Sequence, residues 1–168
     1  MINNTLKQTL FKYSPVILLF ISILNEIDFN NSDYTYFSFN FVYILIFYYS
    51  LKRDGGIGYI FIFIAGLFND VVNGQPMGIS SLCYLLLSAA AVYLRNITLR
   101  PNMLKDWAFF FITILVLNFI NFMTLVIFLD YEMNYFDQMV NISFTFLLYI
   151  FFSFIFKTYD DFIQGKFN

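Results

Sequence analysis

One carboxylate stands out in the sequence because it lies within a long apolar stretch. Asp70 belongs to the segment GLFNDVVNGQPMGISSLCYLL, residues 66–86, which also carries Asn73, Gly74 and Pro76. A carboxylate at the centre of a membrane helix costs about 2.5–3.5 kcal/mol, and such residues usually face the interior of a helical bundle. We therefore expect Asp70 to point inward and to have specific hydrogen-bond partners.

Three kinds of chemistry are open to Asp70. It can accept hydrogen bonds from the amino end of the following helix, where the helix dipole favours a negative charge. It can form a polar contact with a partner protein, or it can carry protons or ions across a membrane. A relay needs further ionisable groups, and no second acid or base lies deep within a predicted membrane segment. Hydrogen bonding within the chain is therefore the first expectation.

The rest of the sequence offers little for catalysis. There is no histidine, and the single cysteine, Cys83, lies in an apolar run where a small buried side chain is the ordinary interpretation. No Gly-rich phosphate loop or metal-ligand spacing occurs. The acid pairs Asp160–Asp161 and Asp130–Glu132 lie in polar segments, where solvated charges are expected. The sequence predicts neither an enzyme nor a bound metal or cofactor, and its net charge of −2 argues against a nucleic-acid partner.

The composition indicates that most of this chain is surrounded by lipid and not by water. Of the 168 residues, 60% are hydrophobic and only 12% are charged, compared with about 25% charged in soluble proteins. Apolar windows suited to membrane helices recur over residues 11–27, 34–51, 56–73, 76–95, 107–129 and 140–156. We therefore predict an all-α integral membrane protein, a six-helix transmembrane bundle in which residues 1–168 form one domain.

The charged residues give the expected orientation in the membrane. Six membrane helices put successive loops on alternate sides, and Lys and Arg concentrate in short cytoplasmic loops. All basic residues fall at the chain ends or in the second and fourth loops: Lys7, Lys12, Lys52, Arg53, Arg95, Arg100, Lys105, Lys157 and Lys166. We therefore expect both termini on the cytoplasmic side. Trp107 falls at a predicted helix end, as expected for a ring that anchors at headgroup level.

The residues around Asp70 predict a tight hairpin between the third and fourth helices. Asn73 and Gly74 suit the end of a helix, and Pro76 suits the first turn of the next one. Small residues, including Gly66 and Gly78, let the helix backbones approach closely. The hairpin should therefore be compact.

Other polar residues within the helices suggest two further features. On the fifth helix, Thr113, Asn121 and Thr124 share a face with Asn118 beside it, which predicts hydrogen bonds between helices. Polar residues of the second and sixth helices lie towards the outer side together with Asp70. They are expected to line a shallow outer polar cavity: Ser38, Asn40, Asn141, Ser143 and Thr145.

The segment around Asp70 resembles the core motif of MreD, a family of bacterial rod shape-determining membrane proteins. The resemblance implies a noncatalytic scaffold of the peptidoglycan elongation machinery in the bacterial cytoplasmic membrane. Implied partners are an MreC-like bitopic membrane protein, MreB, RodA and a penicillin-binding transpeptidase, with membrane lipids around the helices. The predicted structural and partner-binding motif consists of the matching positions and two residues of the turn: Gly66, Leu67, Asp70, Asn73, Gly74, Pro76 and Gly78.

The resemblance also supplies a second hypothesis. MreD proteins are similar in fold to the substrate-binding subunits of energy-coupling-factor vitamin transporters, which are six-helix bundles with an outward pocket. Those subunits typically dock through an Ala-x-x-x-Ala patch on the first helix, whereas PVILLFISIL, residues 15–24, carries large apolar residues. We therefore favour the scaffold over a small-molecule transporter subunit.

Overall fold

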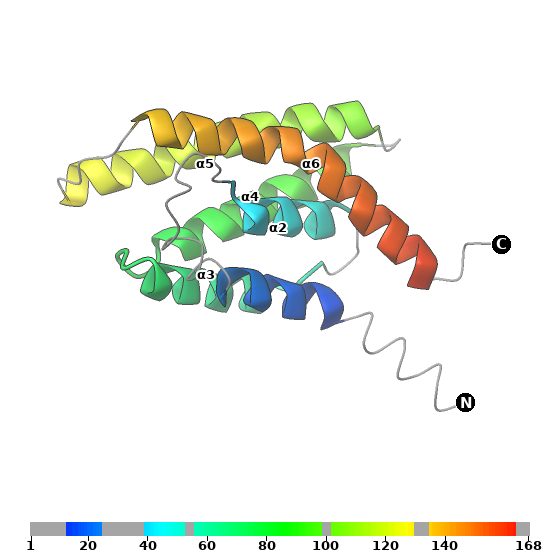
Figure 1. Cartoon of the computed structure of the whole chain (residues 1–168), viewed down its shortest axis with the longest axis horizontal. Coiled ribbons are helices and arrows are strands. Elements are labelled where there is room, and N and C mark those ends of the chain that lie inside the picture. The colour runs from blue at the N-terminus through cyan, green and yellow to red at the C-terminus, as the bar shows by residue number, and fades with distance from the viewer. Residues whose placement is uncertain (1–12, 25–38, 53–55, 99–101, 130–134, 164–168) are drawn as a thin grey trace.

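The protein is an all-helical bundle in the part of the chain that the structure describes. The computed structural model describes residues 13–24, 39–52, 56–98, 102–129 and 135–163, and these residues form six helices without a strand (Figure 1). The helices are a first helix Tyr13–Leu24, α2 Phe41–Lys52, α3 Tyr59–Val72, α4 Ile79–Ile97, α5 Met103–Leu129 and α6 Tyr135–Ile163. The predicted all-α class is therefore confirmed.

The helices differ in length more than the sequence predicts. Three of the described helices, α4, α5 and α6, are long and apolar enough to cross a membrane, whereas the first helix, α2 and α3 are shorter. The six-span count therefore stays a prediction. The helix α6 runs over residues 135–163 rather than 140–156, because its polar ends continue the helix beyond the apolar window.

The helix α2 begins later than predicted. Its predicted span starts at residue 34, but residues 34–38 lie outside the described residues, and the helix itself begins at Phe41. The side-chain oxygen of Asn40 accepts a hydrogen bond from the backbone N–H of Tyr43 at 3.0 Å. This is the geometry of an N-cap, so Asn40 fixes the start of α2.

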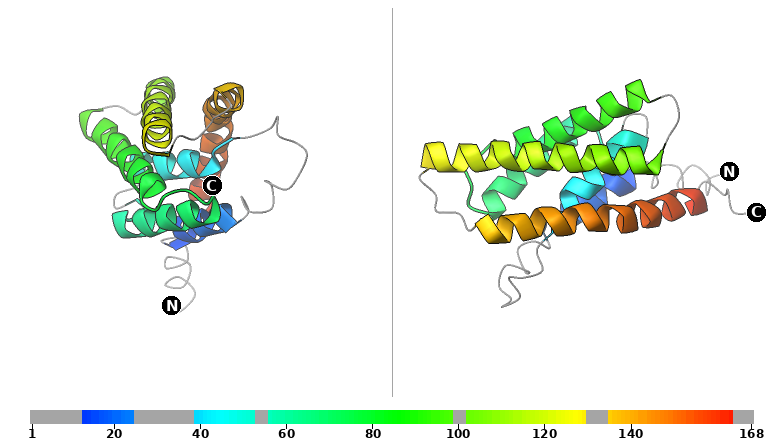
Figure 2. Two further views of the ribbon diagram at one scale, coloured as in Figure 1. Left: turned by 90° about the vertical axis from the view of Figure 1, so that its left-hand side faces the viewer. Right: turned by 90° about the horizontal axis from the view of Figure 1, so that it is seen from above.

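The helix α2 forms the centre of the bundle. Every residue from Val42 to Leu51 is buried, as expected for a helix that is apolar on all sides. In both figures α2 lies between the α5–α6 pair and the layer of α3 and the first helix (Figures 1 and 2). The ring of Phe47 packs against those of Phe110 on α5 and Tyr149 on α6, with centroids 4.9 and 5.7 Å away. The outer helices therefore share one core.

Polar contacts hold both ends of α2. At its start, the backbone N–H of Asn40 donates to Oγ1 of Thr145 on α6 at 2.8 Å. At its end, Nζ of Lys52 lies 2.5 Å from Oδ2 of Asp106 on α5. Such contacts are directional, so they fix the position of α2 along its axis, which apolar packing alone specifies less well.

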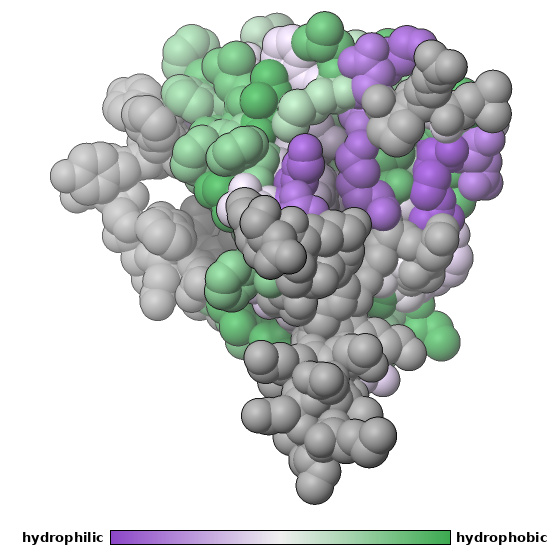
Figure 3. Space-filling model, turned by 90° about the vertical axis from the view of Figure 1, so that its right-hand side faces the viewer, coloured by the Kyte–Doolittle hydropathy of each residue, from purple (hydrophilic) through white to green (hydrophobic). Residues whose placement is uncertain are grey.

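The described basic side chains gather at one end of the bundle. Lys52, Arg95, Lys105 and Lys157 lie near the ends of α2, α4, α5 and α6 that share this side. Figure 3, which views the bundle from this end, shows hydrophilic side chains gathered on part of this face. The grouping agrees with the alternating loops expected from the sequence, and the assignment of this end to the cytoplasm stays a prediction.

The remaining basic residues lie outside the described part of the chain. These are Lys7, Lys12, Arg53, Arg100 and Lys166. The acid pair Asp130–Glu132 also lies outside the described residues. The expected orientation therefore rests on the four described basic positions and on the sequence.

Candidate functional site

The candidate site is the hairpin that joins α3 to α4. The helix α3 ends at Val72 and is capped by Asn73, whose backbone N–H donates to the carbonyl of Asn69 at 3.0 Å, and the chain then reverses at Gly74 with a φ of 63°. A second left-handed residue, Gly78 with a φ of 107°, precedes the first residue of α4. Only glycine adopts these angles readily, so the two glycines determine where the chain turns.

The position of Pro76 differs from the prediction. The sequence placed it in the first turn of a helix that begins at residue 76, but α4 begins at Ile79 and Pro76 lies in the turn before it. The left-handed conformation of Gly78 separates Pro76 from the helix, because a left-handed residue cannot continue a right-handed helix. Pro76 therefore belongs to the connection and not to α4.

Asp70 caps the amino end of α4 from the neighbouring helix. Its Oδ2 accepts a hydrogen bond from the backbone N–H of Gly78 at 2.6 Å, and its Oδ1 accepts one from the N–H of Ser80 at 2.9 Å. These N–H groups lie at the helix end, where they have no partner within α4. The side chain of Asp70 is fully buried. The expectation that Asp70 accepts hydrogen bonds from the amino end of the fourth helix is confirmed, and we call this arrangement the Asp70 cap.

A second polar contact lies beside the Asp70 cap. The side-chain amide of Asn69 donates to the hydroxyl of Ser80 at 3.0 Å, and Asn69 is buried. The sequence alone does not predict the pairing of Asn69 with Ser80. The signal was weak but present, because Asn69 is a second polar residue next to Asp70 in an apolar stretch.

The backbones of α3 and α4 touch at Gly66. A Cβ atom added at Gly66 would overlap the backbone of Ser81 and come within 2.7 Å of its Oγ. The hydroxyl of Ser81 donates to the carbonyl of Phe63 at 3.0 Å across the same contact. Gly66 is therefore required for the close approach of the two helices, as expected for small residues in membrane bundles.

The residues of the predicted motif do not all lie together. Gly66, Asp70 and Gly78 lie on the contact between α3 and α4, as described above. Asn73 and Gly74 are exposed in the turn. Leu67 is half-buried. The structure therefore joins part of the motif into one cap, and a role of the motif in partner binding stays a prediction.

The predicted outer polar cavity does not form around Asp70. Asp70 is 0% exposed and Thr145 is 2% exposed, so neither lines an open space. Thr145 is used instead to bind the start of α2, and the exposed Ser143 donates to the carbonyl of Met139 on its own helix at 2.8 Å. Ser38 lies outside the described residues.

For three α5 side chains, the hydrogen bonds found in the described part of the chain lie within the helix and not between helices as predicted. Thr113, Asn118 and Thr124 each donate to a carbonyl one turn earlier in α5, at 2.8 Å in every case. The carbonyl four residues back is always within reach in a helix, so these side chains need no partner on another helix. The side-chain oxygen of Asn121 is buried without a hydrogen-bond partner among the described residues.

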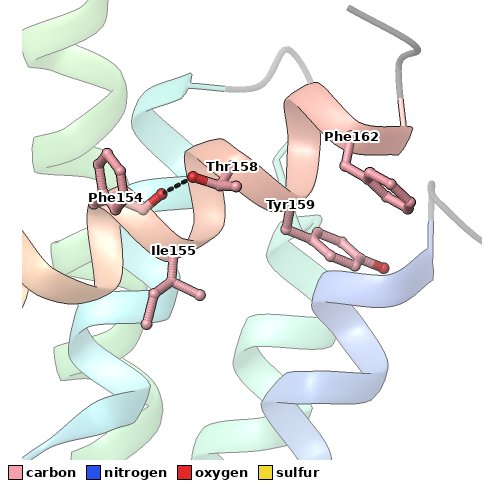
Figure 4. A pocket seen from close by; sticks show the side chains of 5 residues that line it. All are labelled: Phe154, Ile155, Thr158, Tyr159 and Phe162. Carbon is pink, nitrogen blue, oxygen red and sulfur yellow. Dashed lines mark hydrogen bonds between the residues drawn. The ribbon is translucent and has the colours of Figure 1, made fainter. Parts of the chain in front are cut away.

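The described surface has two shallow hollows. One lies on the last turns of α6, near the first helix, and is lined by Phe154, Ile155, Thr158, Tyr159 and Phe162 (Figure 4). The other lies between α5 and α6, where Asn118, Tyr135 and Gln138 join apolar residues. The hydroxyl of Thr158 is already used, because it donates to the carbonyl of Phe154 at 3.0 Å. No group of three or more His, Cys, Asp or Glu side chains in the described ranges is placed to hold a metal ion.

These features define a class of protein. The bundle of apolar helices, with its polar groups turned inward and hydrogen-bonded, is that of an all-helical membrane protein. The family model described as rod shape-determining protein MreD matches residues 7–160, and the chain belongs to this family. No curated protein and no solved structure gave a significant match to the chain. MreD proteins form a non-enzymatic family of membrane proteins with a role in rod shape determination.

Proposed function

We propose that the protein is a noncatalytic scaffold of the cell-elongation machinery in the bacterial cytoplasmic membrane. It would bind the membrane helix of an MreC-like partner and help to position MreB, RodA and a penicillin-binding transpeptidase. Membership of the MreD family supports this role in shape determination. The proposal treats residues 1–168 as one membrane domain with both termini in the cytoplasm.

The observation that carries the proposal is the locked hairpin of α3 and α4. The Asp70 cap and the contact at Gly66 hold the two helices in one register. The fixed hairpin presents an exposed stripe on α4, which we call the α4 stripe: Leu82, Leu86, Ala89 and Tyr93. A membrane helix packs best where a small residue allows close approach, and Ala89 provides such a position near the centre of the stripe.

Co-purification tests the partner. Purification of the tagged protein from rod-shaped cells in mild detergent should recover an MreC-like protein. Ala89→Leu should weaken this recovery, because the added side chain would hold the partner helix away. Ala108→Leu is the matched control, since Ala108 is also an exposed alanine but lies on α5. Equal recovery with both variants would count against the α4 stripe, and absence of an MreC-like protein with the unchanged chain would count against the partner.

Two further measurements test the role and the orientation. Depletion of the protein should turn rods into round cells, and unchanged elongation after a clean deletion would contradict the scaffold. For orientation, Lys105→Cys should react with a membrane-impermeant reagent only from the cytoplasmic side and Asn73→Cys only from the outside. Both positions are exposed, and the native thiol of Cys83 is buried.

The alternative is a substrate-binding subunit of a vitamin-type transporter. No charged side chain lines either of the two hollows given above, and neither is enclosed by helices on all sides as an outward pocket of a transporter subunit would be. The exposed side of the first helix carries the large residues Ile17, Ile21 and Leu24 rather than small ones. Recovery of transporter ATPases in the purification would favour the transporter over the scaffold.

A further inference from the structure

The two sides of the bundle expose apolar surfaces of very different height. On one side, α3 has 14 residues and is therefore only about 21 Å long. Its exposed apolar residues run along nearly the whole helix: Tyr59, Ile60, Phe61, Phe63, Ile64, Phe68 and Val71. The hydrocarbon of a typical bilayer is about 30 Å thick, so this surface is too short to match it.

The ends of α3 are fixed, so the surface cannot lengthen by sliding or by adding helical turns. The helix begins after Gly58, whose φ is 88°, and ends at Val72, followed by its cap Asn73 and by Gly74 with a φ of 63°. Asn73 and Gly74 are exposed and polar. The Asp70 cap prevents α3 from moving along α4. Tilting α3 would only reduce the height that it spans.

The opposite side of the bundle is much taller. There α5 has 27 residues and α6 has 29, which correspond to about 40 and 44 Å. Exposed apolar side chains extend from Met103 to Met123 on α5 and from Tyr135 to Phe162 on α6. Figures 1 and 2 show α5 and α6 on one side of α2 and the shorter α3 on the other. The long helices can therefore match a bilayer of ordinary thickness.

We propose that the α3 side of the protein binds a locally thin bilayer and prefers lipids with short acyl chains. In a bilayer of ordinary thickness, one polar end of α3 would lie in hydrocarbon, where backbone groups without partners are costly. Thinning of the bilayer next to α3 avoids this burial, as is general for short hydrophobic surfaces. The inference does not depend on the proposed partner or on the role in cell shape.

Site-specific fluorescence quenching tests the proposal on the full-length chain. The protein has one tryptophan, so a Trp107→Phe background leaves room for one reporter on each side. Phe63→Trp places the reporter on α3 and Phe119→Trp places the matched reporter on α5, at native positions that are 43% and 60% exposed. The purified variants are placed in phosphatidylcholine vesicles with brominated lipids of about 14 or about 22 acyl carbons, which bracket the ordinary thickness.

In the Phe63→Trp variant, short brominated lipids should quench the tryptophan fluorescence about twofold or more better than long ones, because short lipids match the short surface of α3. At Phe119→Trp the preference should be absent or reversed. The same chain-length dependence at both reporters would overturn the proposal. Weak quenching by every lipid at Phe63→Trp alone would also overturn it, because another helix or a second copy would then cover α3.

A spin label on Asn73→Cys keeps the proposal testable if a tryptophan variant does not fold. The label is attached to the full-length chain in vesicles of ordinary thickness, with Cys83 replaced by Ser. Access of a water-soluble nickel complex to the label should exceed that of oxygen, because thinning keeps the end of α3 in water. Oxygen access typical of hydrocarbon at this position would overturn the proposal.

Discussion

Replacement of Asp70 tests whether the cap stabilises the hairpin. Both carboxylate oxygens are occupied, one by the N–H of Gly78 at 2.6 Å and the other by the N–H of Ser80 at 2.9 Å. Asp70→Ala removes both acceptors and leaves two N–H groups at a buried helix end. Asp70→Asn keeps one oxygen but turns an NH₂ group towards the second N–H. The asparagine variant should therefore lose about half of the stabilisation, although its shape is almost unchanged.

The size of the effect follows from the number of hydrogen bonds lost. A buried donor left without a partner costs about 1–3 kcal/mol, and loss of an N-cap to alanine costs about 0.5–2 kcal/mol. We expect Asp70→Ala to lower the free energy of unfolding by about 2–5 kcal/mol and Asp70→Asn by about 1–3 kcal/mol. Asp137→Asn is the matched control, since Asp137 lies exposed in the first turn of α6, and it should cost less than about 1 kcal/mol.

The measurement is unfolding by sodium dodecyl sulfate in mixed micelles, followed by far-ultraviolet circular dichroism. The expected order of stability is the unchanged chain, then Asp70→Asn, then Asp70→Ala. If both Asp70 variants unfold at the same detergent fraction as the unchanged chain, the cap does not hold the hairpin and the reasoning is refuted. If only Asp70→Asn is neutral, one hydrogen bond is sufficient and the second oxygen contributes nothing.

Three further changes address other contacts in the same assay. Gly66→Ala should lower the free energy of unfolding by well over 1 kcal/mol, because the added Cβ would overlap α4. Gly74 has open space around it, so Gly74→Ala should cost only the strain of a left-handed alanine, about 1–2 kcal/mol. Equal effects of the two variants would refute the close approach. Lys52→Met should cost about 2–4 kcal/mol, because it leaves the buried carboxylate of Asp106 unpaired. Asp106→Asn should cost less, because the amine of Lys52 reaches water. The reverse order of these two costs would contradict this account. Trp107→Phe should cost only about 0.5–1.5 kcal/mol, since the ring still stacks and one hydrogen bond is lost; complete unfolding would show that the indole does more.

The hairpin could be predicted from the sequence because its signals are local. Asn73 and Gly74 end a helix through their own backbone preferences, and Asp70 is close in sequence to the amides that it caps. The exact first residue of α4 is harder to predict from the sequence. It depends on the left-handed conformation of Gly78, and a glycine in a sequence does not show which conformation it takes.

Contacts between distant segments could not be predicted in the same way. Lys52 and Asp106 are 54 residues apart, and Asp106 reads in the sequence as one more charge next to a basic loop. Its burial becomes evident only once α2 and α5 are packed together. Trp107 is a similar case, because its ring donates to the carbonyl of Phe146 on α6 at 3.0 Å, a partner that lies 39 residues away in the sequence. Its expected place at headgroup level stays a prediction.

The polar residues of α5 show a different limit of sequence reasoning. Their spacing places several of them on one face of the helix, but spacing does not reveal which acceptor each will use. Thr113 and Thr124 bind carbonyls of their own helix, so no neighbouring helix is needed to satisfy them. A polar stripe in a membrane helix is therefore weak evidence for contact between helices.

The inner contacts of the bundle and its exposed surface on α4 should have different roles, the first in stability and the second in binding a partner. Displacing α2 along its axis would break the contact at Asn40 and the ion pair at Lys52 together, and it would leave the buried carboxylate of Asp106 unpaired. A bundle held in this way presents a nearly fixed surface, which supports the proposed scaffold role.

Changes to the inner contacts should then alter cell shape through lower stability and abundance. Ala89→Leu should instead alter cell shape at unchanged stability, through weaker binding of the partner. A variant at Ala89 that rounds the cells only by unfolding the protein would contradict this separation.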